Sequence, residues 1–194
     1  TLGHDTKNIS IVGIHFRGNF RGDGIGHIGI NDGGGNILIE DCLIERFTNG
    51  ITLSVDGDIN APSNKKTIHG VTIRRSIIVD NYNQSGSGIH PQGIYAYGVN
   101  GLVVEDNVID NSGRLPNGDK GTIYDHNVYI NAMNWNVAVR GNIIANGGSH
   151  GLQLRSGGLA HGNFFYNNPI HMSFGLVNGG GPVIPNGVTG NVSN

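Results

Sequence analysis

The stretch VAVRGNIIAN, residues 137–146, decides the fold, because two short apolar strands meet there at a bend around Asn142. On each side of the bend, apolar residues alternate with other residues, which is the period-two pattern of a strand with one buried face. The same phrase returns as ISIVGIHFRG from Ile9, ILIEDCLIER from Ile37, VTIRRSIIVDN from Val71, LVVEDNVIDN from Leu102, LAHGNFFYNN from Leu159 and VTGNVSN from Val188. A phrase that returns along the whole chain predicts a repeat architecture.

Aligning these phrases brings the bend residues into one column. The spacing within the column varies from 21 residues, between Asn142 and Asn163, to 35 residues, between Asn107 and Asn142. A variable period above a fixed minimum is typical of a solenoid whose coils carry loops of different lengths. Stacked asparagine amides would bond to one another and to the backbone at the bend. The predicted bend column contains Ile14, Cys42, Ser76, Asn107, Asn142, Asn163 and Asn191.

A third short strand lies between successive phrases. Its copies are predicted at 27–30, 50–55, 93–97, 127–131, 151–155 and 170–174. Three strands per coil that run the same way predict an all-β fold, a right-handed parallel β-helix of about seven coils in one domain over 1–194. A β-sandwich or propeller would need hairpin turns, and few Asn-Gly or Asp-Gly pairs stand between adjacent strands. End caps are not evident, so we expect flanking sequence or other subunits to cover the solenoid ends.

Composition excludes several classes of protein. Charged residues make up 13% of the chain and the formal net charge is -2, which argues against a nucleic-acid-binding surface. Apolar runs are far shorter than a membrane span. Cys42 is the single cysteine, so neither an intrachain disulfide nor a cysteine-based metal site can form.

Insertions cluster on both sides of the third strand and leave the bend column untouched. Loops carry function because they are solvated and free to vary, so we predict that these insertions wall a groove over the third-strand sheet. Tolerated insertion is the alternative, since loop length costs little entropy. The insertions span 18–26, 80–92 and 110–125 before the third strand, and 56–67 and 175–185 after it.

The outward face of the third strands gathers polar and aromatic side chains. The inward residues are predicted to be Ile28, Ile51, Ile94, Val128, Leu152 and Ile170, so their neighbours point outward. Tyrosine rings stack on sugar faces, arginine grips carboxylates and histidine moves protons near neutral pH. We therefore predict a site for a uronic-acid polymer. Its residues are Tyr95, Tyr97, His126, Tyr129, Asn131, His150, Gln153, Arg155 and His171.

The chemistry predicted for this patch is removal of the proton at C5 of a uronate. Glycoside hydrolysis needs two carboxyl groups. The outward positions of the third strands contain no Asp or Glu, although Asp125 is adjacent, which argues against a hydrolase. Proton abstraction instead needs a cation at the carboxylate, a base and an acid, for which the patch offers Arg155, His126 and Tyr129, with His150 beside them. Protonation from the opposite face gives epimerisation, and loss of the 4-linked sugar gives β-elimination. Sugar contacts are assigned to Tyr95, Tyr97, Gln153, Asn131 and His171.

The repeat resembles the pectate-lyase-like β-helix superfamily over nearly the whole chain. Within it, YDHN at 124–127 is similar to the Asp-Pro-His-Asp motif of mannuronan C5-epimerases, and HGLQLRSGG at 150–158 resembles their following coil. The resemblance implies His126 as the base and Arg155 as the carboxylate neutraliser. Tyr124, Asp125 and Asn127 depart from the motif. The resemblance also implies a secreted protein, located outside the cell, at the cell surface or in the periplasm.

A second class of function stays open, namely a non-catalytic β-helix such as a tailspike shaft, an adhesin segment or a sugar-binding module. His126 and His150 would then only bond turn carbonyls, and Tyr95 and Tyr129 would only stack between coils. No cofactor is required by either reading. Calcium is the alternative, because carboxylates lie in the loops, although EF-hand spacing is absent. Its candidate ligands are Asp32, Asp56, Asp58 and Asp119.

Overall fold

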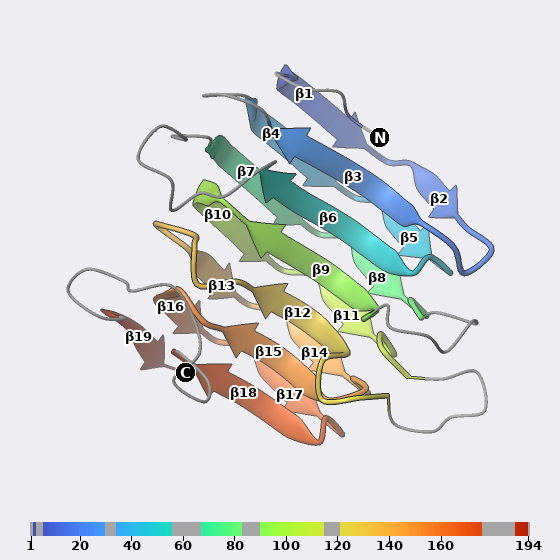
Figure 1. The fold of residues 1–194 in the computed structure, drawn as a ribbon, viewed down its shortest axis with the longest axis vertical. Helices are drawn as coiled ribbons and strands as arrows, with labels where there is room; N and C mark the ends of the chain where they lie inside the picture. The colour runs from blue at the N-terminus through green and yellow to red at the C-terminus, as the bar shows by residue number, and fades with distance from the viewer. Residues whose placement is uncertain are drawn as a thin grey trace.

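The protein is a parallel β-helix. The computed structural model describes residues 2, 6–29, 34–55, 67–82, 90–114, 121–175 and 189–193. Over these residues every strand pair is parallel, and each strand pairs with the strand three positions further along the chain. Successive strands therefore belong to three different sheets, and the coils stack from the N-terminal end to the C-terminal end (Figure 1). This confirms the predicted fold class. Within the described ranges, no helix is long and apolar enough to cross a membrane.

Each coil contributes one strand to each sheet. The first sheet contains β1 (Lys7–Val12), β4 (Gly35–Glu40), β7 (Ile68–Arg74), β10 (Val99–Glu105), β13 (Ala138–Arg140), β16 (Gly157–His161) and β19 (Thr189–Ser193). The second sheet contains β2 (His15–Arg17), β5 (Leu43–Glu45), β8 (Ile77–Val79), β11 (Val108–Asp110), β14 (Ile143–Ala145) and β17 (Phe164–Tyr166). The third sheet contains β3 (Asp23–Gly29), β6 (Asn49–Val55), β9 (Gln92–Tyr97), β12 (His126–Ile130), β15 (His150–Leu154) and β18 (Ile170–Phe174).

The core is a set of aliphatic ladders that run along the solenoid. In the second sheet the strand register places one inward isoleucine of each coil over that of the next, about 4.8 Å away. These side chains are fully buried, as are their counterparts in the third sheet. β-Branched residues suit this arrangement because they pack well on a pleated surface. The two ladders contain Ile44, Ile78, Ile109 and Ile144, and Ile51, Ile94, Val128 and Leu152.

The bend between the first and second sheets carries the predicted amide column. The backbone N–H of Ser76 donates to Asn107 Oδ1, that of Asn107 to Asn142 Oδ1, and that of Asn142 to Asn163 Oδ1, each at 3.0 Å. Cys42 begins the series by donating its N–H to Ser76 Oγ at 3.1 Å. Each buried side chain thus satisfies a backbone group of the preceding coil that a sharp turn would leave without a partner.

The bend column was extended wrongly at its C-terminal end. Asn191 lies inside β19 and pairs with Leu159 of β16. Leu159 lies four positions before the bend residue Asn163. Gly190 and Asn191 repeat the Gly-Asn dipeptide of the bends at Gly141 and Gly162, which explains the misalignment. The ladder hydrogen bonds with β16, and not the dipeptide, set the position of this strand.

The third sheet also differs from the predicted alignment at its two ends. β3 begins at Asp23, so Ile25 pairs with Ile51, and Ile28 pairs with Ser54 instead. At the other end, Ile170 pairs with His150, and Met172 takes the inward place after Leu152. In both strands two apolar residues compete for one inward place, and sequence periodicity alone does not separate them. The four middle coils match the prediction.

Replacing Asn142 by alanine is expected to lower the free energy of unfolding by about 3 kcal/mol. Its Nδ2 donates to Asn163 Oδ1 and Val104 O, and its Oδ1 accepts from Asn107, so the change leaves several buried polar groups without partners. Urea unfolding followed by circular dichroism measures the loss. The matched control is Asn191→Ala, at an exposed position of β19, expected within about 0.5 kcal/mol of the wild type. Equal losses in both variants would contradict the amide-column assignment.

Candidate functional site

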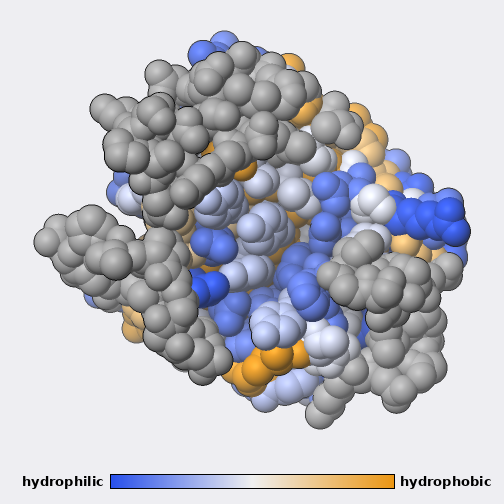
Figure 2. All heavy atoms as spheres, viewed as in Figure 1, coloured by the Kyte–Doolittle hydropathy of each residue, from blue (hydrophilic) through white to orange (hydrophobic). Residues whose placement is uncertain are grey.

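The outer face of the third sheet brings most of the predicted site together. Thr52, Tyr95, Tyr129 and Gln153 follow one another in a single register column. A second column holds Ser54 beside Tyr97, with Asn131 and Arg155 directly after the ends of β12 and β15. Figure 2 views this face, on which hydrophilic and intermediate residues fill the centre. Three or four coils therefore contribute to one polar surface, as the sequence predicted.

The insertions predicted to wall this face fall largely outside the described residues. Residues 56–66, 83–89, 115–120 and 176–188 are among those that the structure does not describe. The bends between the first and second sheets keep two residues in each coil, as at 41–42 and 106–107, so the absence of insertions there is confirmed. The groove walls themselves stay a prediction.

Tyr129 lies at the centre of the polar surface and is held by two donors. Arg155 Nη1 donates to the Tyr129 hydroxyl at 2.8 Å, and Asn131 Nδ2 donates to the same oxygen at 3.4 Å. The hydroxyl oxygen therefore acts as an acceptor within the protein, which leaves its own proton for an outside acceptor. All three residues are half-buried. They combine a phenol, an amide and a guanidinium within reach of one ligand.

Tyr95 extends this surface by one coil. Its ring lies 5.5 Å from the Tyr129 ring, at an interplanar angle of 56°, so the two rings form a tilted aromatic pair. Burial, followed by the neighbouring phenols of Tyr129 and Tyr97, raises the pKa of Tyr95 to about 12. Tyr95 consequently stays a neutral phenol at physiological pH and offers a ring face and a hydroxyl rather than a charge.

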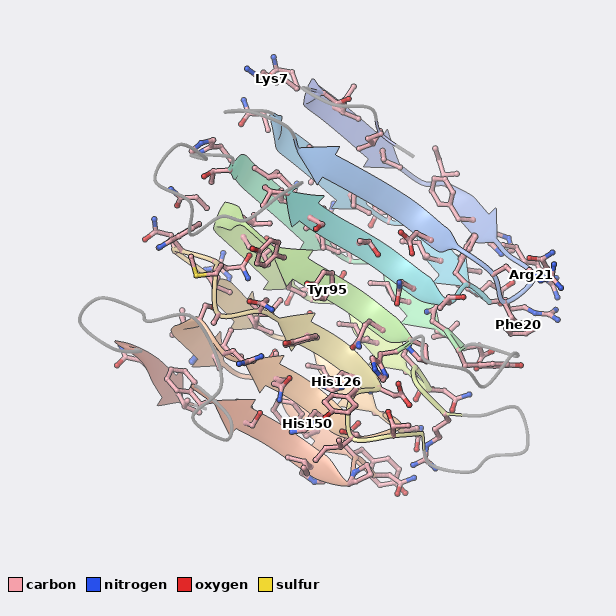
Figure 3. The ribbon with its side chains drawn as sticks, viewed as in Figure 1. Lys7, Phe20, Arg21, Tyr95, His126 and His150 are labelled. Carbon is pink, nitrogen blue, oxygen red and sulfur yellow. The ribbon has the colours of Figure 1, made fainter. Side chains whose placement is uncertain are left out.

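Two imidazoles lie in contact beside the tyrosines (Figure 3). The rings of His126 and His150 are 4.8 Å apart, and the side chains are only 2% and 3% exposed. Burial lowers the pKa of His126 to about 4, against a partly compensating hydrogen bond with Gln153, and burial also lowers the pKa of His150. Both imidazoles are therefore neutral at pH 7.

The hydrogen-bond partners define which ring nitrogens carry protons. Ser149 Oγ donates to Ile123 O at 2.9 Å, so it accepts from His150 Nδ1–H at 2.7 Å, and His150 Nε2 keeps its lone pair. Gln153 Oε1 accepts from His126 Nε2–H at 2.9 Å, which leaves the lone pair on His126 Nδ1. Within the described residues, this buried Nδ1 has no hydrogen-bond partner. His126 Nδ1 is thus an unprotonated nitrogen kept in a buried position.

His126 also continues a structural ladder along the start of the third-sheet strands. Asn49 Nδ2 donates to Asp23 Oδ1 at 3.0 Å, Gln92 N–H donates to Asn49 Oδ1 at 3.0 Å, and His126 N–H donates to Gln92 Oε1 at 3.2 Å. The four strand starts therefore satisfy one another's polar groups, coil by coil. This supports a structural contribution of His126, which the sequence analysis left open.

His90 and Asp125 form a neighbouring pair that the sequence analysis did not assign. Asp125 is 5% exposed, and burial raises its pKa. His90 Nδ1 lies 3.5 Å from Asp125 Oδ1, and the His90 ring packs at 4.8 Å on the Tyr124 ring. The position of Asp125 next to His126 was the one available signal. His90 lies two positions before β9, inside the predicted insertion at 80–92, where no strand pattern predicted a contact with Asp125.

His171 is not where the sequence predicted it. Ser173 pairs with Gln153, and His171 lies two positions earlier, where its Nδ1 contacts Asn168 O at 3.0 Å and its ring lies 6.2 Å from Phe165. The error follows from taking Ile170 as the inward residue of β18. The other predicted residues of the third sheet, from Tyr95 to Arg155, lie on one face as expected.

No metal centre emerges from the described part of the chain. There, no group of three or more His, Cys, Asp or Glu side chains is arranged to hold an ion. The calcium ligands considered from the sequence all lie outside the described residues. Those four residues are Asp32, Asp56, Asp58 and Asp119.

Comparison of the chain with protein families, with curated proteins and with solved structures finds no match in any of the three. The assignment of the fold therefore stands on the strand topology alone. The resemblance to pectate-lyase-like proteins and to mannuronan C5-epimerases stays a prediction from the sequence.

The buried imidazoles predict a loss of stability at acid pH. The pKa of His126 is about 4 in the folded protein and 6.5 in the unfolded chain, so only the unfolded chain binds a proton between these values. The free energy of unfolding is therefore highest above about pH 6.5 and decreases towards pH 4, by about 3 kcal/mol for His126 alone. Urea titrations across this range measure the slope.

In His126→Gln the dependence of the unfolding free energy on pH is expected to become weaker. The control is His69→Gln, which changes an exposed histidine and is expected to keep the wild-type dependence. A wild-type protein whose unfolding free energy does not change between these pH values would contradict the neutral, buried state of His126.

Proposed function

We propose that this protein binds an acidic polysaccharide on the outer face of the third sheet and removes the C5 proton of a uronate residue. The observation that carries the proposal is the contact of Arg155 Nη1 and Asn131 Nδ2 with the Tyr129 hydroxyl, at 2.8 and 3.4 Å. A cation, a proton-transferring oxygen and a flat aromatic neighbour at Tyr95 meet there. This combination suits a sugar that carries a carboxylate.

Arg155 takes the substrate carboxylate in this proposal. A guanidinium binds a carboxylate through paired N–H donors and withdraws charge from it, which makes the adjacent C5–H more acidic. Donors that are already fixed before the reaction stabilise the charge that develops in the transition state. The contact with Tyr129 fixes the guanidinium next to the oxygen that would exchange the proton.

Tyr129, rather than His126, takes the proton-transfer role. His126 is 2% exposed and its Nε2–H already donates to Gln153, whereas the Tyr129 oxygen lies on the half-buried face. In the reactive form Tyr129 has released its own proton to water. Its phenolate oxygen accepts the C5 proton, and the C5–H electron pair forms the C4–C5 double bond. The C4–O4 bond then breaks with its electron pair, and O4 takes up the proton that Tyr129 has gained. Return of a proton to the opposite face of C5 gives the epimer instead.

His126, His150 and Gln153 support this centre from below. His126 bonds to Gln153 and His150 bonds to Ser149, and these neutral side chains add no charge that would compete with Arg155. A low-dielectric floor strengthens the interaction between a guanidinium and a bound carboxylate. We therefore assign these residues to positioning and desolvation.

A non-catalytic glycan-binding module is the second candidate. The observation that favours it is that both imidazoles of the patch, the groups best suited to move a proton near neutral pH, are almost fully buried, at 2% for His126 and 3% for His150. Only Tyr95, Tyr97, Tyr129, Asn131 and Arg155 would then contact the sugar. Binding through aromatic faces and one guanidinium needs no proton transfer.

Catalysis is tested by incubating the protein with alginate, pectate and glycosaminoglycans. The expected result is ultraviolet absorbance from an unsaturated uronate or, for epimerisation, deuterium at C5 in D₂O seen by proton NMR. Tyr129→Phe is expected to lower the rate about 10²- to 10⁴-fold, the range for loss of a general acid or base. The control is Tyr166→Phe, which changes an exposed phenol on the second sheet. Absence of both signals on every polymer would sink the catalytic proposal.

Carboxylate recognition is tested separately by titration calorimetry. Arg155→Lys is expected to weaken binding of an acidic polysaccharide about tenfold, because an ammonium cannot reproduce the paired contact of a guanidinium. The same variant should bind the carboxyl-reduced form of that polymer as the wild type does. Binding without turnover would select the module over the enzyme, and a wild type that binds neither polymer would overturn both.

A further inference from the structure

An apolar stripe runs along the outside of the second sheet, behind the face viewed in Figure 1. The strand register places its members in one line across successive coils. Three of them are large and exposed, with Ile77 at 46%, Ile143 at 47% and Phe164 at 61%. Contiguous apolar patches are rare on soluble proteins unless another surface covers them. The stripe contains Leu43, Ile77, Val108, Ile143 and Phe164.

The two ends of this stripe differ in a complementary way. At the N-terminal end the same sheet carries His15 and Arg17, whose side chains are 49% and 58% exposed. At the C-terminal end it carries Phe164 and Tyr166, which are 61% and 60% exposed. Cationic side chains are attracted to aromatic faces. The basic side chains at one end of the stripe are therefore suited to contact the aromatic rings at the other end.

We infer that a second copy of this chain packs against the second sheet, with the two solenoid axes antiparallel. A two-fold axis parallel to the strands keeps the strand direction and reverses the order of the coils. Such an axis makes each contact occur twice, as an isologous interface requires. The contacts pair His15 with Phe164, Arg17 with Tyr166, Leu43 with Ile143, and Ile77 with Val108.

The acidic residues of the sheet do not oppose this arrangement. Glu45 already pairs with Arg17 at 3.4 Å and contacts His15 Nε2 at 3.0 Å, so its carboxylate enters the interface with partners from its own copy. Asp110 accepts from Asn146 Nδ2 at 2.7 Å. Under the two-fold operation neither carboxylate faces another carboxylate. Glu45 then faces Ala145 and Asp110 faces Val79, so no two carboxylates lie directly opposite each other. The two Asp110 side chains lie one strand spacing apart across the axis.

The size of the face predicts a reversible dimer. Six strands spaced about 4.8 Å apart and three residues wide give a flat area of about 300 Å², or roughly 500 Å² per copy with side-chain relief. The total is at the lower limit of specific interfaces, so we expect a dissociation constant on the order of 10 to 100 µM. This association is independent of the proposed polysaccharide chemistry, because it uses another sheet.

Sedimentation velocity of the whole chain, from about 1 µM to about 1 mM, tests the proposal. The wild type is expected to shift from monomer to dimer across this range. Ile143→Lys is expected to raise the dissociation constant at least tenfold, and Val192→Lys, at a 59% exposed position of the first sheet, is expected to leave it unchanged. Circular dichroism confirms that each variant is folded, and Phe164→Ser provides a second change at an exposed position.

The orientation is tested by cross-linking with a short bismaleimide. Packed sheets lie about 10 Å apart, too far for a direct disulfide but within reach of this reagent. A mixture of Arg17→Cys and Tyr166→Cys chains should give linked dimers, whereas either variant alone should not, and native Cys42 is 2% exposed and does not compete. Wild-type protein that stays monomeric at every concentration would overturn the inference. Dimers linked through position 17 alone would overturn the antiparallel arrangement.

Discussion

The structure depends on the buried amides at the bend between the first and second sheets. A two-residue bend exposes backbone groups that a strand ladder cannot satisfy, and Asn107 and Asn142 satisfy them while bonding to each other at 3.0 Å. Because each amide contacts both the coil before and the coil after, a one-residue slip would leave several polar groups buried without partners. The column therefore fixes the register, and the register stacks the aliphatic ladders of the core.

The same register creates the candidate site. Tyr95, Tyr129 and Gln153 are 34 and 24 positions apart in the chain (95 to 129 and 129 to 153), yet they lie on adjacent strands about 4.8 Å from one another. Loops between the strands can change length without moving these side chains, because the sheet and not the loop positions them. A solenoid thus places a polar surface on a rigid support, which is what recognition of an extended polymer requires.

The middle of the protein could be predicted from the sequence and its ends could not. In the middle coils each strand has a neighbour on both sides, and the fixed bend separates the two strands of a phrase, so Ile94, Val128 and Leu152 had one consistent alignment. In β3, Ile25 and Ile28 were equally compatible with the inward position. In β19, the Gly190–Asn191 pair looked like a bend. Burial was also beyond the sequence, because the expectation that His126 belongs to the outer face does not reveal that neighbouring side chains cover it.

That burial separates the two kinds of chemistry on the third sheet. A histidine on an open face would titrate near neutrality, whereas the desolvated His126 has a pKa of about 4 and contributes a fixed dipole rather than a mobile charge. Charge recognition then falls to Arg155, and proton exchange to the hydroxyl that Arg155 holds. Association through the second sheet would leave this face open in both copies. An antiparallel pair would present two such faces to one polymer and raise its apparent affinity without any new sugar contact.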